Sequence, residues 1–506
     1  MDESTDISVS SNMVVYVYFL EGGELQVEFL ELAKLKGGKA VDVVAGLIDV
    51  LSTKERGNLV DKLVTLGTDG CSTMMGAKGG VGKLLREKCP FLLQFHCMAH
   101  KLMLAVAAAF DDDEVYEVDR LLSAIYGQFK YSSKKRERLD EIHAELSARA
   151  GDEVKAKLRS IKRHVRTRWL SRGESIQSVL DCLEEAVTFI LDEMSLKADD
   201  VDGDSGFTAA GKKSAMKPPE LKGKVLEFKV IALLHFLGDV TELLNIVSKT
   251  LQKTKPDLLE VFDAIEGLIA SFETNYPPTG KIKWGPRMRA FLERSEVDVG
   301  SESPGPIPIT STHKIMFTKS DVVELYTIVR DCSERLVDQL RDRMPDADVI
   351  RAMLIFDARR LPLPEASGGK QPVLPQDYGD GEIEALINWF APDGKPAYID
   401  ADELRAEWLL FKGGCLVRSR GMSYHGMYRM LSTGDQFPNI TKLLAVAVLF
   451  PIANAVCERG FSTQNLIKSK LTNRLGKHLD PKMRVCELGP EPGSKDATAV
   501  TKRRRV

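Results

Sequence analysis

Strand-like and helix-like segments alternate along the first part of the chain, and this alternation constrains the fold more than any other feature. Residues 12–20 and 24–35 are rich in β-branched and aromatic residues and are separated by Glu-Gly-Gly, which predicts a β-hairpin. Residues 39–55 place apolar side chains on one helical face, residues 62–69 form a short apolar strand that ends in an acid, and residues 91–110 indicate a strand that runs into a helix. The order predicts an α/β layer.

Long amphipathic helices replace this alternation from about residue 115 to residue 450. Residues 220–253 and 319–344 show the clearest helical periodicity. Three stretches rich in glycine, proline, serine and aspartate interrupt the helical part and are expected to be exposed loops, at residues 198–219, 297–310 and 361–381. The chain is therefore expected to combine an α/β part with a large all-helical part.

The composition is that of an ordinary globular protein, since 43% of the 506 residues are hydrophobic and 28% are charged. The formal net charge of -3 excludes a strong overall cationic field, so any contact with nucleic acid is expected to come from local patches. The eight scattered cysteines include no Cys-x-x-Cys pair and favour a reducing, intracellular compartment. No signal-peptide pattern is present, and no apolar run approaches the roughly 20 residues that span a bilayer, so we expect no membrane partner.

Residues 67–85, GTDGCSTMMGAKGGVGKLL, allow two interpretations. The second half is close to a phosphate-binding glycine loop that would use Lys83, but Leu84 stands where a hydroxyl would ligate Mg²⁺, and STMMGA separates the glycines from the preceding strand. The first half places Asp69 directly after a strand and before Gly70, a natural position for a ligand of a hard cation. The alternative for Asp69 is an ordinary turn or helix cap, so a metal site requires partners for it.

Cys97 and His100 have the Cys-x-x-His spacing of half a tetrahedral zinc site. No second Cys or His pair lies nearby in the sequence, so a structural zinc ion is not expected from spacing. The alternative is that Cys97 packs in the core and that His100 makes a fixed hydrogen bond at the start of a helix.

Residues 163–175 surround Trp169 with cationic side chains. These are Arg163, His164, Arg166, Arg168 and Arg172. A cationic cluster around an indole suits nucleic acid, because guanidinium groups bind phosphate and the ring can stack on a base. The alternative is a solvated basic turn whose tryptophan fills the core.

Residues 451–475 predict an amphipathic helix near the end of the chain. The side chains expected to pack are those of Val456, Phe461, Leu466 and Leu475. Glu458 lies in the first turns of this helix among small and apolar neighbours. A buried helical acid is costly unless it is paired or bound to a metal, whereas an exposed one near a helix N-terminus only favours the helix dipole.

Five segments, taken in order, resemble the motifs of the hAT superfamily of DDE transposases: DESTD, GTDGCSTMMG, HCMAH, TRWLSRGES and CERGFSTQNLIKSKLTNRL. The resemblance covers nearly the whole chain, and its most specific element is the last, which is similar to the family's C-terminal dimerisation region. It implies an RNase H-like α/β catalytic core that is interrupted by a large all-helical insertion and completed by a C-terminal helical part.

The resemblance also implies a division of the chain into four parts. Residues 1–112 would be the N-terminal part of the core, residues 113–425 the helical insertion, and residues 426–488 the dimerisation region with the last catalytic acid. Residues 489–506 would be a disordered basic tail. Its last five residues, KRRRV, are a candidate nuclear import signal or DNA contact, with a solvated terminus as the alternative.

By motif position, the resemblance implies that Asp2, Asp69 and Glu458 are the catalytic acids. Asp6 is the less favoured alternative to Asp2 as the first acid. Together the three acids would hold two Mg²⁺ or Mn²⁺ ions. Such ions activate water or a 3′-hydroxyl and stabilise the leaving oxygen, here in the cleavage of DNA at transposon ends and its joining to a target.

The remaining motifs receive supporting roles from the resemblance. Trp169 matches a tryptophan associated with stacking on a displaced base, and Cys97 and His100 match a motif whose role is structural. The residues expected to contact DNA are Trp169, Arg166, Arg168 and Arg172, and those expected at the dimer interface are Phe461, Leu466 and Leu475.

Two departures from the family leave a second function open. No Cys/His zinc-finger module precedes the first motif, and the sequence begins at Met1, so we expect most of the first core strand to be missing, with residues 7–11 as a short substitute. The alternative function is therefore a domesticated or truncated protein that dimerises and associates with DNA without catalysis. Both functions imply DNA and a second copy of the chain as partners, and a nuclear location.

Overall fold

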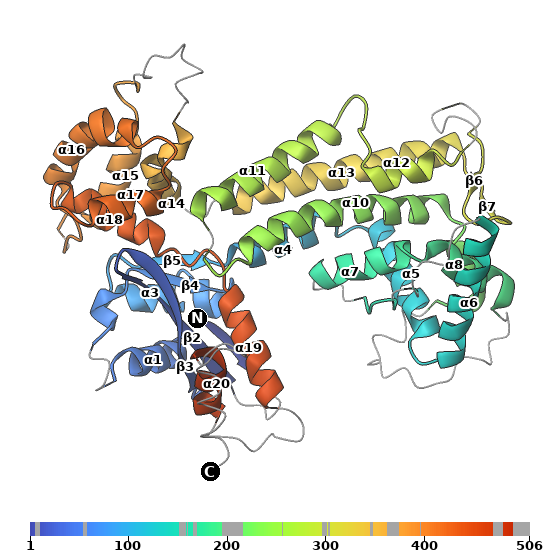
Figure 1. Ribbon diagram of the computed structural model, residues 1–506, viewed down its shortest axis with the longest axis horizontal. Coiled ribbons are helices and arrows are strands. Elements are labelled where there is room, and N and C mark those ends of the chain that lie inside the picture. The colour runs from blue at the N-terminus through green and yellow to red at the C-terminus, as the bar shows by residue number, and fades with distance from the viewer. Residues whose placement is uncertain are drawn as a thin grey trace. The chain divides into compact units, whose positions relative to one another are not determined.

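The protein combines an α/β part with a large helical part, as the sequence predicts (Figure 1). The computed structural model describes residues 1–5, 11–53, 58–150, 158, 160–164, 169–194, 216–255, 257–295, 301, 304–344, 348–361, 374–394, 396–468 and 479–488. Contacts divide the chain into two compact units. Unit 1 comprises Met1–Lys101, Lys249–Asp263 and Arg343–Val506, and unit 2 comprises Leu102–Ser248 and Ala264–Asp342.

Unit 1 contains two small sheets, formed by β1 (Asp2–Thr5), β2 (Ser11–Glu21) and β3 (Glu24–Lys34), and by β4 (Thr65–Thr68) and β5 (Leu93–His96). The first sheet is antiparallel in the order β1-β2-β3, and β4 and β5 are parallel. The expected hairpin is confirmed, because β2 and β3 are joined by Gly22 and Gly23, whose φ angles of 57° and 82° favour glycine. The Met1 amino group donates to the Gly67 carbonyl at 2.9 Å, so β1 begins beside β4.

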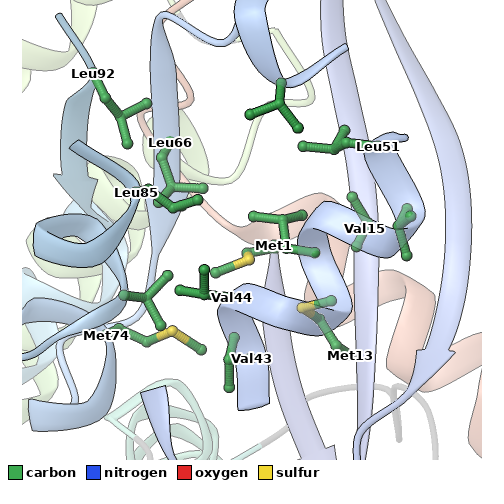
Figure 2. Packing of buried hydrophobic residues seen from close by; sticks show 14 of the residues in the cluster. Met1, Met13, Val15, Val43, Val44, Leu51, Leu66, Met74, Leu85 and Leu92 are labelled. Carbon is green, nitrogen blue, oxygen red and sulfur yellow. The ribbon is translucent and has the colours of Figure 1, made fainter. Parts of the chain in front are cut away.

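Helices cover both faces of these strands (Figure 1). On one face lie α1 (Ala40–Leu51), α2 (Ser72–Met75) and α3 (Val81–Arg86), which follow the predicted helix-strand order. Figure 2 shows the apolar cluster there, in which Met13 and Val15 of β2 pack with side chains of these helices. Burial of one such side chain stabilises the fold by roughly 1.5–3 kcal/mol. Val14, between them in sequence, points to the other face because side chains alternate along a strand.

The second face carries α19 (Ala455–Ile467) and α20 (Leu479–Leu488). Gly460 lets α19 lie close to β2, since a Cβ there would lie 2.8 Å from the Tyr16 hydroxyl oxygen. Val456 is buried on the sheet and Phe461 is partly buried against the same cluster, as predicted. The prediction that Leu466 packs is wrong, because the residue is 84% exposed. Leu475 lies outside the described residues.

Five further helices belong to unit 1, namely α14 (Asp348–Ala352), α15 (Asp380–Phe390), α16 (Ala401–Leu410), α17 (Tyr424–Leu431) and α18 (Pro438–Val448). The boundary therefore differs from the expected helical insertion of residues 113–425. Two hydrogen bonds explain the difference. The Trp389 indole N–H donates to the Phe91 carbonyl next to β5, at 3.3 Å, and the Tyr424 hydroxyl accepts from the Leu258 N–H at 2.7 Å.

Short helical turns join these elements of unit 1. They are η1 (Val60–Lys62), η5 (Met353–Phe356), η6 (Ala358–Arg360) and the π-helical η8 (Phe411–Leu416). Arg359 in η6 bonds the carboxylates of Asp357 and Asp257, which ties the returning segment Lys249–Asp263 to this part of the unit.

Where the structure describes it, unit 2 is helical apart from a two-residue ladder of β6 (Ile307–Pro308) and β7 (Lys314–Ile315). Its helices are α4 (Met98–Ala109), α5 (Asp113–Phe129), α6 (Ser133–Ala150), α7 (Trp169–Leu180), α8 (Leu183–Thr188), the π-helical η2 (Phe189–Glu193), α9 (Pro218–Lys224), α10 (Phe228–Leu251), α11 (Leu258–Asn275), α12 (Pro286–Leu292) and α13 (Lys319–Arg343). The helix expected at residues 319–344 is confirmed. The one expected at residues 220–253 is two helices, α9 and α10.

The expectation that no apolar stretch is long enough to span a bilayer is wrong for α10. Within the described parts of the chain, α10 is the one helix that is long and apolar enough to do so. However, 78% of its most apolar window is buried inside the protein. Its Asp239 accepts hydrogen bonds from the backbone N–H groups of Arg287 and Met288 at the start of α12. These observations describe α10 as a core helix of unit 2.

Candidate active site

The three predicted acids all lie in unit 1, on elements that meet at one end of the parallel strands. Asp2 opens β1, Asp69 directly follows β4, and Glu458 lies in the first turn of α19. The hydrogen bond from the Met1 ammonium to the Gly67 carbonyl brings the first two segments together. Asp2 and Asp69 are half-buried, and Glu458 is exposed. Asp6 lies outside the described residues.

Electrostatic coupling links Asp2 to both of the other acids. The pKa of Asp2 is raised to about 6, mainly because the carboxyl group is buried and further because the Asp69 and Glu458 carboxylates repel its charged form. The Met1 ammonium and the Glu3 backbone N–H act in the opposite direction. Burial and then Asp69 also raise the pKa of Glu3, which sequence reasoning did not single out. Acids from three distant parts of the sequence thus contribute to one negative field.

The carboxylate groups that create this field are of the ligand type that divalent cations prefer. Mg²⁺ and Mn²⁺ prefer carboxylate oxygens, and a cation among these groups would offset the repulsion that raises the pKa of Asp2. Among the residues that the structure describes, no three His, Cys, Asp or Glu side chains are already gathered closely enough to hold a metal ion.

Asn454 fixes the position of the helix that carries Glu458. Its side-chain N–H donates to the Met1 carbonyl at 3.2 Å, and its backbone N–H donates to Cys97 Sγ at 3.2 Å. Asn454 is buried and directly precedes α19. Asparagine before a helix is a known capping signal, but here its side chain bonds another segment instead of capping α19. Sequence reasoning missed this residue, because nothing local reveals its distant partners.

Two neighbouring contacts bring residues 449–454 close to β4 and β5. Thr65 donates its hydroxyl hydrogen to the Leu449 carbonyl at 3.0 Å, and the Met98 N–H donates to the Ile452 carbonyl at 3.0 Å. Gly67 is required here, because a Cβ would lie 2.8 Å from the Pro451 side chain. The C-terminal segment is therefore held against the edge where Asp69 leaves β4.

His96 is a further residue at this edge that sequence reasoning missed. It is the last residue of β5 and is in register with Thr68, so its ring lies next to the turn that carries Asp69. A Cβ at Gly70 would lie 2.1 Å from His96 Cε1, so only glycine fits there. The available signal was positional, since adjacent parallel strands end at the same edge of a sheet.

Cys97 has a structural role at this junction. It is buried, its backbone N–H donates to the Thr68 carbonyl at 2.9 Å, and its sulfur accepts from Asn454. Burial raises the pKa of the thiol, which keeps it protonated and unlike a zinc-bound thiolate. His100 lies in the first turn of α4, with its ring centroid 5.2 Å from that of His96.

The glycines of the sequence GAKGGVGKLL serve local packing. A Cβ at Gly82 would lie 1.7 Å from the side-chain oxygen of Gln94 on β5, so α3 can approach β5 only with glycine there. The Gly80 N–H donates to the Gly76 carbonyl at 2.8 Å and is not available to a phosphate. Lys83 is exposed on the short helix α3. These contacts favour the cation-ligand interpretation of residues 67–85 over the nucleotide one.

No model of a known protein family matches the chain.

The predicted DNA-contacting residues belong to unit 2, and one of them is not available to DNA. Arg172 on α7 is only 3% exposed, and its guanidinium lies 2.9 Å from the buried carboxylate of Asp119 on α5. His164 Nε2 lies 3.4 Å from the same carboxylate oxygen. The expectation that Arg172 binds phosphate is therefore wrong in this structure, because a buried cation is held by its counter-ion. Arg166, Arg168 and the Trp169 side chain lie outside the described residues.

Replacing Asp2 with asparagine is expected to change how stability depends on pH. The pKa of Asp2 is about 6 in the folded protein and 3.8 ordinarily, so its contribution is fully present below about pH 4 and is lost as pH rises through 6. Between pH 4 and pH 7 the wild type should lose up to about 3 kcal/mol of unfolding free energy relative to Asp2→Asn, measured by urea denaturation. Asp435→Asn, at an exposed position, is the control and should follow the wild type. Parallel curves for the wild type and Asp2→Asn would contradict the raised pKa.

Replacing Arg172 with methionine is expected to destabilise unit 2 by roughly 3–5 kcal/mol, because the Asp119 carboxylate would stay buried without its cation. The double variant Arg172→Met/Asp119→Leu should recover much of this loss, and Arg163→Met, at an exposed position, should change little. Thermal and urea unfolding provide the measurement. A stable Arg172→Met protein with weakened DNA binding would restore a direct DNA role for this residue.

Proposed function

We propose that the chain derives from a hAT-type DDE transposase, with unit 1 as an RNase H-like catalytic core and unit 2 as its helical insertion. The ancestral activity is metal-dependent cleavage and transfer of DNA strands. The observation that carries this proposal is the coupling of Asp2 to Asp69 and Glu458, the same three acids that the sequence motifs select.

The arrangement of strands supports the proposal. β1 pairs with β2 of the hairpin, and Met1, which directly precedes β1, bonds Gly67 of β4. A single sheet in the order β3-β2-β1-β4-β5 is part of the proposal. An RNase H-like core is expected to have one acid on the central strand and a second at the end of its parallel neighbour, the positions of Asp2 and Asp69. Unit 2 interrupts unit 1 in sequence, as an insertion would.

Each part of the site has a task under this proposal. Bound Mg²⁺ or Mn²⁺ would supply charge stabilisation for the attacking and leaving oxygens at phosphorus. Asp2, Asp69 and Glu458 would hold the cations, and Asn454 keeps Glu458 in place by bonding the Met1 carbonyl. The His96 ring, packed against Gly70, restricts the turn that presents Asp69. Pre-organised ligands of this kind lower the cost of assembling a site.

DNA is the proposed partner, and the nucleus is the proposed location. Because Arg172 pairs with Asp119, the residues of the TRWLSRGES motif that we propose to contact DNA are Arg166, Arg168 and Trp169. The basic residues of the tail 489–506 are a second candidate contact with the phosphate backbone.

Cation-dependent nicking of DNA provides the test of catalysis. We expect Mn²⁺-dependent nicking of hairpin or supercoiled DNA by the full chain, and a loss of at least about 100-fold in Asp2→Asn, Asp69→Asn and Glu458→Gln. Mn²⁺ affinity, measured by calorimetry without DNA, should fall in the same variants. Lys83→Ala is the control and should retain both properties. Mn²⁺ binding that none of the three carboxylate changes weakens would refute the site, and ATP binding lost in Lys83→Ala would revive the nucleotide interpretation.

We also propose that α19 mediates self-association, which is the function that would remain without catalysis. Leu466 is 84% exposed in the motif that resembles the family's dimerisation region, and an apolar side chain there gains by being covered. Phe461 is partly buried on the sheet and can contribute only its remaining surface.

Light scattering at micromolar concentration tests this surface. The wild type is expected to be a dimer or larger, and Leu466→Glu is expected to shift it towards the monomer, because a charge would have to be desolvated in the interface. Leu410→Glu is the matched control, since Leu410 is a leucine that is 69% exposed on a different surface of unit 1. A monomeric wild type, or equal dimerisation of both variants, would contradict the proposal.

A further inference from the structure

The turn between α5 and α6 carries aromatic and cationic side chains in unit 2 (Figure 1). Residues 130–138, KYSSKKRER, begin directly after the last residue of α5 and continue into α6. Tyr131 is 71% exposed. The Lys130 ammonium lies 4.0 Å from the centroid of the Tyr131 ring and 5.8 Å from that of Tyr126. This turn therefore presents an aromatic surface to solvent with a cation beside it.

Arg136 holds the two helix ends together and still has donors to offer. Its Nε–H donates to the Phe129 carbonyl and its Nη2 to the Lys130 carbonyl, both at 2.8 Å, so it closes the C-terminal end of α5. The Ser132 hydroxyl accepts from the Lys135 N–H at 3.2 Å and caps the start of α6. Because a guanidinium has five N–H groups, most donors of Arg136 have no partner among the described residues.

The cations of this segment differ in whether an acid neutralises them. Arg138 pairs with glutamates of α6 and η2 and is fully occupied by them. Lys130 and Arg136 have no carboxylate partner in the part of the chain that the structure describes. Lys134 is exposed beside them. Two neighbouring cations thus remain available to an anion.

A cavity of about 770 Å³ lies beside this turn. Its volume falls within the roughly 300–1,000 Å³ of pockets that bind small ligands. Buried Phe129 and Leu139 line it from α5 and α6, and Ile161 lines another part. Lys162, next to Ile161, donates its N–H to Ser178 Oγ on α7 at 2.9 Å, which holds this wall in place. Parts of α5, α6 and the segment before α7 therefore form one cavity.

The polar and aromatic lining from α5, α6 and their turn supplies four kinds of group. They are the rings of Tyr126 and Tyr131, the hydroxyls of Ser132 and Ser133, the cations of Lys130 and Arg136, and the carboxylates of Glu137 and Asp140. A ligand that uses all of them combines an anion, a flat ring and N–H donors. A nucleotide has this combination, because its phosphate is an anion and its base is a flat ring with N–H groups at the edge.

We propose that this cavity, which we call the tyrosine pocket after Tyr126 and Tyr131 in its lining, binds one nucleotide. The base stacks on Tyr131, whose exposure leaves ring surface for it. The phosphate accepts hydrogen bonds from Lys130 and Arg136, which the short turn places next to that ring. Stacking and charge then act on two parts of the same nucleotide.

Glu137 favours a base with neighbouring N–H donors, because a carboxylate only accepts hydrogen bonds. Guanine presents N1–H and the N2 amino group side by side. Uracil and thymine have a single N–H between two carbonyl oxygens, and these oxygens repel a carboxylate. Glu137 is exposed and has no cationic partner among the described residues. We therefore expect the tyrosine pocket to bind guanine more tightly than uracil or thymine.

The tyrosine pocket is separate from the acids of the candidate active site. It belongs to unit 2, whereas Asp2, Asp69 and Glu458 belong to unit 1. Its phosphate contacts come from side chains and need no metal ion, so the proposal does not rest on cleavage of DNA. The nucleotide can be free in solution or part of a single strand, and the experiment distinguishes these two sources.

Calorimetric titration of the full chain with 5′-GMP, without divalent cations, tests the pocket. We expect Tyr131→Ala to weaken GMP binding at least about tenfold and Tyr131→Phe to retain it within about twofold, because phenylalanine still stacks. Lys130→Ala should weaken it about tenfold through the lost bond to phosphate. Lys314→Ala removes an exposed lysine of β7 in the same unit and is the matched control, with binding like that of the wild type.

Two comparisons identify the base and the source of the nucleotide. UMP should bind at least about fivefold more weakly than GMP, and Glu137→Gln should reduce this difference. Single-stranded d(TTGTT) should bind at least about tenfold more tightly than GMP if the ligand is a strand, because its further phosphates reach Lys134. The strand d(TTTTT) is the control for the base. A pentamer that binds no more tightly than GMP assigns the pocket to free nucleotides.

Three results would overturn the proposal. Absence of binding by both GMP and d(TTGTT) at millimolar concentration would leave the pocket without a nucleotide. GMP binding that Tyr131→Ala and Lys130→Ala leave unchanged would place the nucleotide elsewhere. Inorganic phosphate that competes as strongly as GMP would show an anion site that does not recognise a base. Circular dichroism confirms that each variant is folded, and the nicking assay with Asp2 and Asp69 variants reports on the proposed catalysis independently.

Discussion

The contacts of Asn454 hold together the three segments on which the candidate site depends. Its side chain bonds the Met1 carbonyl at the start of β1, and its backbone bonds Cys97 at the junction of β5 and α4. Asn454 directly precedes α19, so one buried residue relates the beginning of the sheet, the end of β5 and the helix of Glu458. Buried polar groups with every partner in place specify a unique arrangement more strongly than apolar contacts do. The rest of unit 1 packs around this junction.

The layers of unit 1 explain how acids can be placed at such a junction. Met13 and Val15 face one apolar cluster and Val14 the other, so the strands are anchored from both sides. Burial then raises the pKa of Asp2, with Asp69 and Glu458 adding to the effect, which means that the folded protein carries an electrostatic cost at this place. Such costs are typical of functional sites, where stability is given up for chemistry. In unit 2 the opposite holds, because the buried Arg172 and Asp119 neutralise each other.

Local patterns predicted the elements of the fold well. Gly22 and Gly23 marked the hairpin turn because only glycine adopts such backbone angles without strain, and the periodicity of residues 319–344 marked α13. The same patterns failed where a distant partner decides the outcome. Arg172 belongs to a basic sequence, yet it is buried and paired with Asp119. Leu466 has the spacing of a packing residue, yet it is 84% exposed. The expected limit at residue 425 differs from the limit of unit 1 at Arg343, and Trp389 bonds the segment next to β5.

The sequence by itself determined the strands β2 to β5, most helices and the turn glycines, because these follow from short-range periodicity and backbone preference. Motif order selects Asp2, Asp69 and Glu458 as the proposed catalytic acids. Only the tertiary structure decided that Asp2 lies in the field of the other two acids, that Asn454 bonds Met1, and that His96 packs against Gly70. The physical reason is that burial, hydrogen-bond partners and electric fields depend on groups far apart in the chain. No local pattern records which of them meet.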